Sequence, residues 1–166
     1  MEVSFEVKLR PEDLYRFNMY QTYTGMQGIL SIVIAVIVFV MAAITGHSGS
    51  VSYMFLYIFI GMMVLFYIPV TLWTRAKHTI RTNEVLANPL RFTLTDKAIC
   101  VTQADQSGEL PWDQIYKMIS NRKQVLIYSN RINAYIIPRD QIEAQYQQIA
   151  EIAKAKLPSY RIRMKG

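Results

Sequence analysis

The chain has 166 residues, 52% of them hydrophobic, and its 18 basic and 12 acidic side chains give a net charge of +6. The charges are unevenly distributed, because residues 17–74 are 58 consecutive positions without Lys, Arg, Asp or Glu. A water-exposed segment of this length would carry charges on its surface and loops, so the composition excludes an ordinary soluble domain there and indicates a lipid environment. The single cysteine, Cys100, excludes an intramolecular disulfide.

The N-terminal segment, residues 1–25, is predicted to hold a strand followed by a helix that leads into the charge-free block. Residues 2–10 alternate polar and apolar side chains, which is typical of a strand with one buried face, and Phe5 is its expected anchor in the core. Pro11 suits the first turn of a helix. A lone strand would leave its backbone unpaired, so we expect it to join a sheet formed by the C-terminal part of the chain.

Two apolar segments, 26–44 and 53–73, are each long enough to cross a hydrocarbon core of roughly 30 Å as a helix. Together they define a predicted transmembrane hairpin over residues 26–74. The connection between them is short, uncharged and rich in Gly and Ser, whereas basic residues flank both outer ends. The positive-inside rule therefore predicts a multi-pass protein of the cell membrane with both termini in the cytoplasm.

Beyond a predicted juxtamembrane linker, 75–89, the apolar pattern changes to the period of strands. Residues 90–137 contain several short alternating runs separated by turn residues, which predicts an antiparallel meander. Asp140 followed by Glu143 resembles a capping box at the start of a helix that carries Tyr146 and ends before Pro158. We therefore expect a cytoplasmic domain over 90–158 and a basic tail over 159–166.

The predicted fold class is thus a membrane α+β protein. Its two-helix transmembrane hairpin is inserted in a cytoplasmic antiparallel β-sheet domain, and a C-terminal helix caps the sheet.

Two sequence motifs carry a resemblance to a known family. The run Leu-Pro-Trp-Asp-Gln-Ile at 110–115 and the run Ala-Tyr-Ile-Ile-Pro-Arg at 134–139 resemble patterns of the YcxB-like family of bacterial membrane proteins. The order of strand, hairpin, basic stretch and sheet is also similar to that family over nearly the whole chain. The resemblance implies a C-terminal domain like a bacterial pleckstrin-homology (PH) domain, and it implies no catalytic residue.

Trp112 and Tyr146 are the expected structural anchors of the C-terminal domain, as Phe5 is of the first strand. The indole N–H of Trp112 needs an acceptor, which favours a core position over the alternative of a lipid or peptide contact. Asp113 is expected to cap a short helical turn.

The sequence contains no recognisable catalytic constellation, so we expect a protein that is not an enzyme and has no cofactor or metal. The predicted topology places His47 and His78 on opposite faces of the membrane, where they cannot share a metal ion. No glycine-rich phosphate loop and no nucleic-acid-binding motif accompany the positive charge. Transport is disfavoured because neither span holds an ionisable residue, and two helices form a path only as a homo-oligomer, an arrangement left open.

Basic side chains are the candidate contacts to anionic lipid headgroups or to an unknown protein partner. They are expected at two neighbouring turns, where they would form one basic rim, and in the tail; the alternative is that they are merely solvated. The candidates are Arg122, Lys123, Arg131, Arg161, Arg163 and Lys165.

The leading hypothesis is a non-enzymatic membrane protein whose PH-like domain binds a protein, a peptide or an anionic lipid. The alternative is a protective or immunity-type membrane protein that acts through its transmembrane hairpin.

Overall fold

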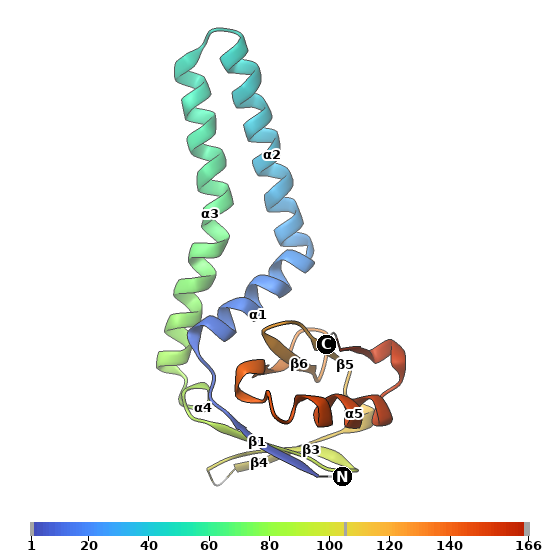
Figure 1. The fold of residues 1–166 in the computed structure, drawn as a ribbon. Helices are drawn as coiled ribbons and strands as arrows, with labels where there is room; N and C mark the ends of the chain where they lie inside the picture. The colour runs from blue at the N-terminus through green and yellow to red at the C-terminus, as the bar shows by residue number, and fades with distance from the viewer. Residues whose placement is uncertain (1, 105, 165–166) are drawn as a thin grey trace. The chain divides into compact units, whose positions relative to one another are not determined.

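The computed structural model describes residues 2–104 and 106–164, which contain five α-helices and eight strands (Figure 1). The α-helices are α1 (Pro11–Thr24), α2 (Met26–His47), α3 (Val51–Thr82), α4 (Glu84–Ala87) and α5 (Tyr146–Lys156). The strands are β1 (Val3–Val7), β2 (Leu90–Leu94), β3 (Ala98–Gln103), β4 (Gln106–Pro111), β5 (Lys117–Ser120), β6 (Gln124–Tyr128), β7 (Ala134–Pro138) and β8 (Ile162–Met164). Short 3₁₀ helices are η1 (Trp112–Gln114), η2 (Arg139–Gln141) and η3 (Ser159–Arg161).

The chain divides into two compact units. Leu14–His78 forms the helical unit, and the remaining described residues form the sheet unit. In the helical unit α2 and α3 lie side by side and are joined by a short turn (Figure 1). Both helices extend beyond the predicted spans, and α3 continues to Thr82 through part of the segment 75–89 that we had predicted to be a linker. Residues 75–82 are therefore helical, because hydropathy marks where the apolar side chains stop, whereas backbone hydrogen bonding continues without a Gly or Pro to end it.

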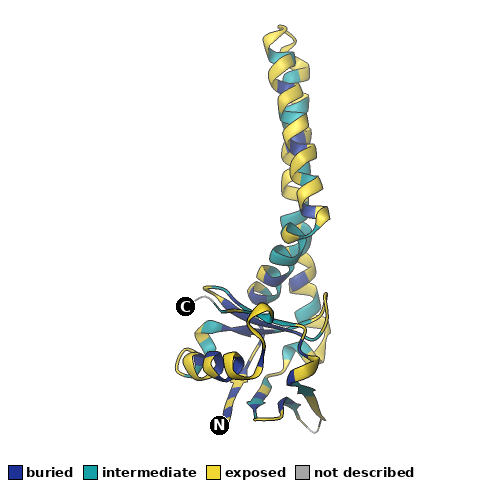
Figure 2. Cartoon of the chain, turned by 90° about the vertical axis from the view of Figure 1, so that its right-hand side faces the viewer, coloured by how far each residue is buried: buried dark blue, intermediate teal, exposed yellow. Residues whose placement is uncertain are grey.

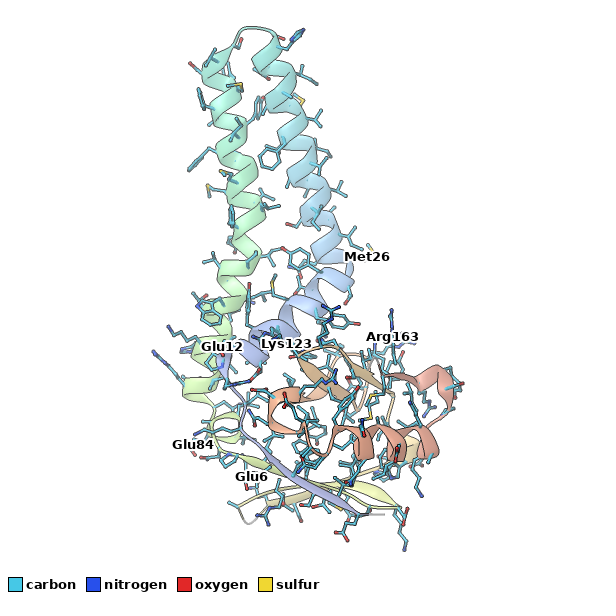
Figure 3. All side chains as sticks on the ribbon, in the orientation of Figure 1. Glu6, Glu12, Met26, Glu84, Lys123 and Arg163 are labelled. Carbon is cyan, nitrogen blue, oxygen red and sulfur yellow. The ribbon has the colours of Figure 1, made fainter. Side chains whose placement is uncertain are left out.

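Both long helices are apolar on surfaces that the protein itself leaves uncovered. Each is long and apolar enough to cross a membrane, and only 17% of the apolar window in α2 and 6% of that in α3 is buried (Figure 2). Side chains along both helices point away from the pair (Figure 3). The helices approach closely at Gly61, where an added Cβ would lie 2.8 Å from the ring of Phe39. This pattern differs from the core helices of a soluble protein, which bury most of their apolar surface.

The sheet unit contains two four-stranded sheets rather than the single antiparallel sheet that we predicted. Sheet A has the order β1-β2-β3-β4 and is antiparallel throughout. Sheet B has the order β7-β6-β5-β8, and its edge strand β8 runs parallel to β5. The predicted basic tail 159–166 is therefore wrong for its described part, because η3 and β8 occupy Ser159–Met164. A three-residue strand gives too short a pattern to be recognised from sequence.

β1 joins sheet A as predicted. It pairs with β2, so that Val7 lies opposite Leu90 and Phe5 lies opposite Phe92. The two phenylalanine rings stack with 5.6 Å between their centroids. Every second residue of β1 is buried, which matches the alternation seen in the sequence.

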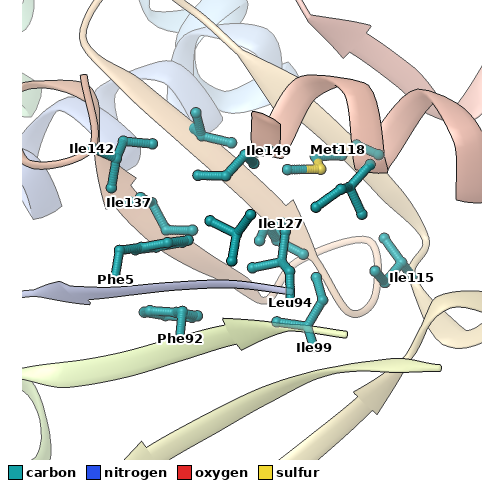
Figure 4. Close-up of a cluster of buried hydrophobic side chains, with 14 of the residues drawn as sticks. Phe5, Phe92, Leu94, Ile99, Ile115, Met118, Ile127, Ile137, Ile142 and Ile149 are labelled. Carbon is teal, nitrogen blue, oxygen red and sulfur yellow. The ribbon is translucent and has the colours of Figure 1, made fainter. Parts of the chain in front are cut away.

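One apolar core joins both sheets and α5 (Figure 4). Phe5, Phe92 and Leu94 contribute from sheet A, while Ile127 contributes from sheet B and Ile149 from α5. The apolar stripe of α5 therefore faces the sheets, although the helix begins later than expected.

The predicted capping box at Asp140 is wrong: residues 139–141 form η2, and α5 starts at Tyr146 without a side-chain cap.

Asp140 instead takes part in an ionic cluster just after β1. The guanidinium of Arg10 lies 2.9 Å from the buried carboxylate of Asp13 and 2.8 Å from that of Asp140. The hydrogen bond that Arg10 donates to the carboxylate of Asp13 raises the pKa of Arg10 above its usual range. The amide side chain of Gln141 accepts a hydrogen bond from the backbone N–H of Lys8 at 2.8 Å and donates one to its carbonyl oxygen at 2.9 Å. These bonds connect the exit of β1 to η2, which follows sheet B.

We predict that the substitution Phe5→Asp destabilises the sheet unit by at least a few kcal/mol, because it places an unpaired charge in the core. Hydrogen exchange of β2 and β3 in the full chain measures the effect. Ser4→Asp, on the exposed face of the same strand, is the control and should leave the exchange nearly unchanged. Equal protection in both variants would contradict the packing of β1 described above.

A second prediction concerns the ionic cluster. Asp13→Asn should lower the free energy of unfolding by roughly 1–3 kcal/mol, because Asp13 is fully buried and its substitution removes the charged partner of Arg10. Asp140→Asn, whose carboxylate is half exposed, should cost less than about 1 kcal/mol. Chemical denaturation of the two variants in detergent, followed by intrinsic fluorescence, compares them; a larger loss in Asp140→Asn would contradict the assignment.

Candidate functional site

The described residues offer little for catalysis. Within 2–104 and 106–164, His, Cys, Asp and Glu form no group of three that could hold a metal ion. The thiol of Cys100 lies 3.9 Å from a carboxylate oxygen of Glu109, its partner across β3 and β4. Partial burial raises the pKa of Cys100, and the negative charge of Glu109 raises it further. A thiol in this environment stays protonated at neutral pH, which is the opposite of an activated nucleophile.

The two turns that carry candidate basic residues are shaped by backbone hydrogen bonds to an asparagine side chain. The side-chain oxygen of Asn121 accepts the backbone N–H groups of Lys123 and Gln124, and thereby shapes the β5–β6 turn that exposes Arg122 and Lys123. Asn130 does the same for the β6–β7 turn, which exposes Arg131. Such Asx turns fix the loop backbone locally, so the points from which these basic side chains leave the backbone are well defined.

The two turns do not form one basic rim, and that prediction is wrong. They precede and follow β6, so they lie at opposite ends of this five-residue strand. At about 3.3 Å per residue, roughly 15 Å separates them along the strand. Consecutive turns of an antiparallel meander alternate between the two ends of the sheet. Turns that are adjacent in the sequence are therefore far apart in the structure.

β8 brings another pair of predicted basic residues onto sheet B. Arg163 lies in β8 opposite Ile119, and its side chain is exposed (Figure 3). Arg161 precedes β8, and its Nη1 donates hydrogen bonds to the carbonyl oxygens of Asp113 and Ile115 at 3.2 and 3.1 Å. Lys165 lies outside the described residues.

The two sheets differ in net charge more than the predicted basic residues alone suggest. Residues 114–139, which hold β5, β6 and β7, carry five basic side chains and no acidic one. Sheet A, by contrast, has mixed charge, with Glu2, Glu6 and Glu109 but also Arg91 and Lys97 on or beside its strands. Two of the five cations, Lys117 and Arg139, were missed from sequence because each is separated from the other basic residues of this stretch. The absence of acidic residues over this stretch was the signal that could have found them.

The three predicted anchors lie as follows. Phe5 and Trp112 are buried, and the indole N–H of Trp112 donates to the carbonyl oxygen of Thr95 at 2.9 Å. The hydroxyl of Tyr146 lies 2.9 Å from that of Ser120, and the guanidinium of Arg139 lies 3.8 Å from the centre of the Tyr146 ring.

The prediction that Asp113 caps a helical turn is wrong, because it lies inside η1 after Pro111.

Fold and charge together define an α+β protein with two long apolar helices and a two-sheet unit of uneven charge. The family model described as YcxB-like protein matches residues 94–153. That segment, which runs from the end of β2 into α5, is therefore a YcxB-like region, in agreement with the sequence motifs. No curated protein and no solved structure matches the chain.

The raised pKa of Cys100 leads to a prediction. Alkylation of Cys100 by iodoacetamide, followed by mass spectrometry, should be slow at neutral pH and should accelerate only above the usual thiol range of about 8.5. Glu109→Gln should shift this profile to lower pH, since it removes a nearby negative charge. The denatured chain is the control, and a native profile identical to it would contradict the assignment.

Proposed function

We propose that this protein is an integral membrane protein in which α2 and α3 form a transmembrane hairpin and the sheet unit is a non-catalytic interaction module in the cytoplasm. The observation that carries the proposal is the large apolar surface of both helices, which the described protein leaves exposed. In water this surface would aggregate, whereas in a bilayer it is favourably solvated and the helical backbone satisfies its own hydrogen bonds.

The pairing of β1 with β2 supports an even number of membrane crossings. Residues 8–89 are inserted between Val7 and Leu90, which lie opposite each other in sheet A. An insertion that leaves and rejoins one sheet returns to the side from which it started. Together with the basic residues that flank its outer ends, this supports a cytoplasmic location for both termini.

A PH-like fold for the sheet unit is supported by two sheets that share one core with a C-terminal helix. The ligand that we propose for the module is a protein, a peptide or an anionic lipid, because sheet B is basic and no catalytic group accompanies it. Fold alone assigns no activity, so the charge of sheet B is what favours binding.

The alternative, a protective protein that acts through its hairpin, is favoured by one observation. A groove of about 410 Å³ lies between α2 and α3, lined mainly by apolar side chains with Ser31 and Tyr67 among them. The substitution Ser31→Phe should fill this groove, and it therefore distinguishes between the two candidate functions. Capture of a membrane partner should persist in this variant if the sheet unit is the binding module, and should be lost if the hairpin is.

The proposed topology predicts the labelling of single cysteines introduced after Cys100→Ser. Ser48→Cys, between α2 and α3, should react with a membrane-impermeant maleimide in intact cells, because the proposed topology places this turn outside. Ser159→Cys should react only after the cells are permeabilised. Labelling of Ser159→Cys alone in intact cells would overturn the topology, and release of the chain from membranes by alkaline carbonate would overturn membrane insertion itself.

A further inference from the structure

One end of sheet B combines exposed or partly exposed basic residues with exposed aromatic and aliphatic ones. Lys117 begins β5 and lies opposite Tyr128, the last residue of β6, so the β6–β7 turn with Arg131 is at this end. Because β8 runs parallel to β5 and Ile162 lies opposite Met118, Arg161 is beside Lys117. Adjacent strands are about 4.8 Å apart, so a width of roughly 10 Å separates β8 from β6.

The same end exposes three large side chains that favour a membrane interface. Tyr116 is 43% exposed, Ile132 at the tip of the β6–β7 turn is 68% exposed, and Tyr160 is 81% exposed. We call Tyr116, Lys117, Arg131, Ile132, Tyr160 and Arg161 the tyrosine end of sheet B. The opposite end, with Arg122 and Lys123, has similar charge, but the β5–β6 turn carries no apolar side chain.

Contacts within the protein hold two of these cations in place. The ammonium group of Lys117 lies 4.5 Å from the ring centre of Tyr128 and 5.8 Å from that of Tyr116. Arg161 is fixed by its two bonds to backbone carbonyl oxygens and lies 5.7 Å from the ring of Tyr160. Cations held in this way lose little side-chain entropy on binding an anion. Asp113 on η1 is the acidic residue in contact with this end, through its backbone, and its single charge leaves a positive balance.

We propose that the tyrosine end of sheet B docks on the surface of a membrane that contains anionic phospholipid. Lys117, Arg131 and Arg161 contact headgroup phosphates, while Tyr116, Ile132 and Tyr160 enter the interface between headgroups and acyl chains. Tyrosine is favoured at that depth, and the combination of basic groups with a few apolar side chains is typical of peripheral membrane binding. Two exposed tyrosines beside an exposed isoleucine at the tip of a turn favour the lipid interface over an acidic protein as the ligand. This inference rests on the proposed function, because it names the ligand of the same module.

The test uses the full chain with Cys100→Ser and Ile132→Cys, labelled with the environment-sensitive fluorophore NBD, in nanodiscs. Emission should shift to the blue when phosphatidylglycerol is added to phosphatidylcholine, and high salt should reverse the shift. Lys117→Gln combined with Arg131→Gln should reduce the docked-to-free ratio by about fivefold for each charge removed. Arg122→Gln combined with Lys123→Gln removes the same charge from the opposite end and should have a much smaller effect.

Two results would overturn the proposal: equal emission in neutral and anionic nanodiscs, or an equal loss in both double variants, which would indicate attraction by net charge alone. Lys117→Arg with Arg131→Lys keeps the charge and should restore the shift if the fold is intact, as circular dichroism verifies. Failure of the chain to enter nanodiscs at all would count against the proposed membrane function, whereas normal insertion without a shift counts against the docking site only.

Discussion

Val7 and Leu90 lie opposite each other in sheet A although residues 8–89 separate them, and this pairing determines the path of the rest of the chain. Without β1, the neighbouring strand β2 would become an edge with unpaired backbone groups and the ring of Phe92 would lose its stacked partner. The pairing also requires both ends of the insertion to meet at one edge of the sheet. A hairpin of two long helices satisfies this requirement, whereas a single helix of the same kind would carry the chain away from its starting point.

The ionic cluster after β1 reinforces that closure. Arg10 joins the first turn of α1 to η2 through Asp13 and Asp140, and Gln141 continues the hydrogen bonding of β1 beyond its last paired residue. The point where the chain leaves the sheet unit is therefore held by charges and by backbone hydrogen bonds. Such contacts oppose local opening at the end of the edge strand, where the backbone would otherwise fray most easily.

Sequence patterns predicted the elements that local chemistry specifies and missed those that depend on distant partners. The alternation in β1 was sufficient to predict a strand, and because an unpaired strand is costly, its place in the C-terminal sheet followed. β8 could not be predicted, since Ile162–Met164 is too short for a pattern and is ordered by pairing with β5. The prediction of the candidate site was wrong for a similar reason: adjacent turns in the sequence suggested that Arg122 and Arg131 form one basic rim. Only strand order shows that they lie at opposite ends of β6 and that Arg131 groups with Lys117.

The binding free energy that the tyrosine end can contribute at a membrane is small, and its proposed role depends on the binding being weak. Each basic group near an anionic membrane contributes about 1 kcal/mol at most, while bringing a free protein to a surface costs several kcal/mol of translational and rotational freedom. The proposed transmembrane hairpin would remove most of that cost, because it would confine the module near the lipid at a high effective concentration. Weak contacts then suffice to orient it and remain weak enough to reverse. What the sequence must specify under these conditions is the placement of exposed apolar side chains at one end of sheet B, since charge that is similar at both ends would attract the module without choosing which end meets the membrane.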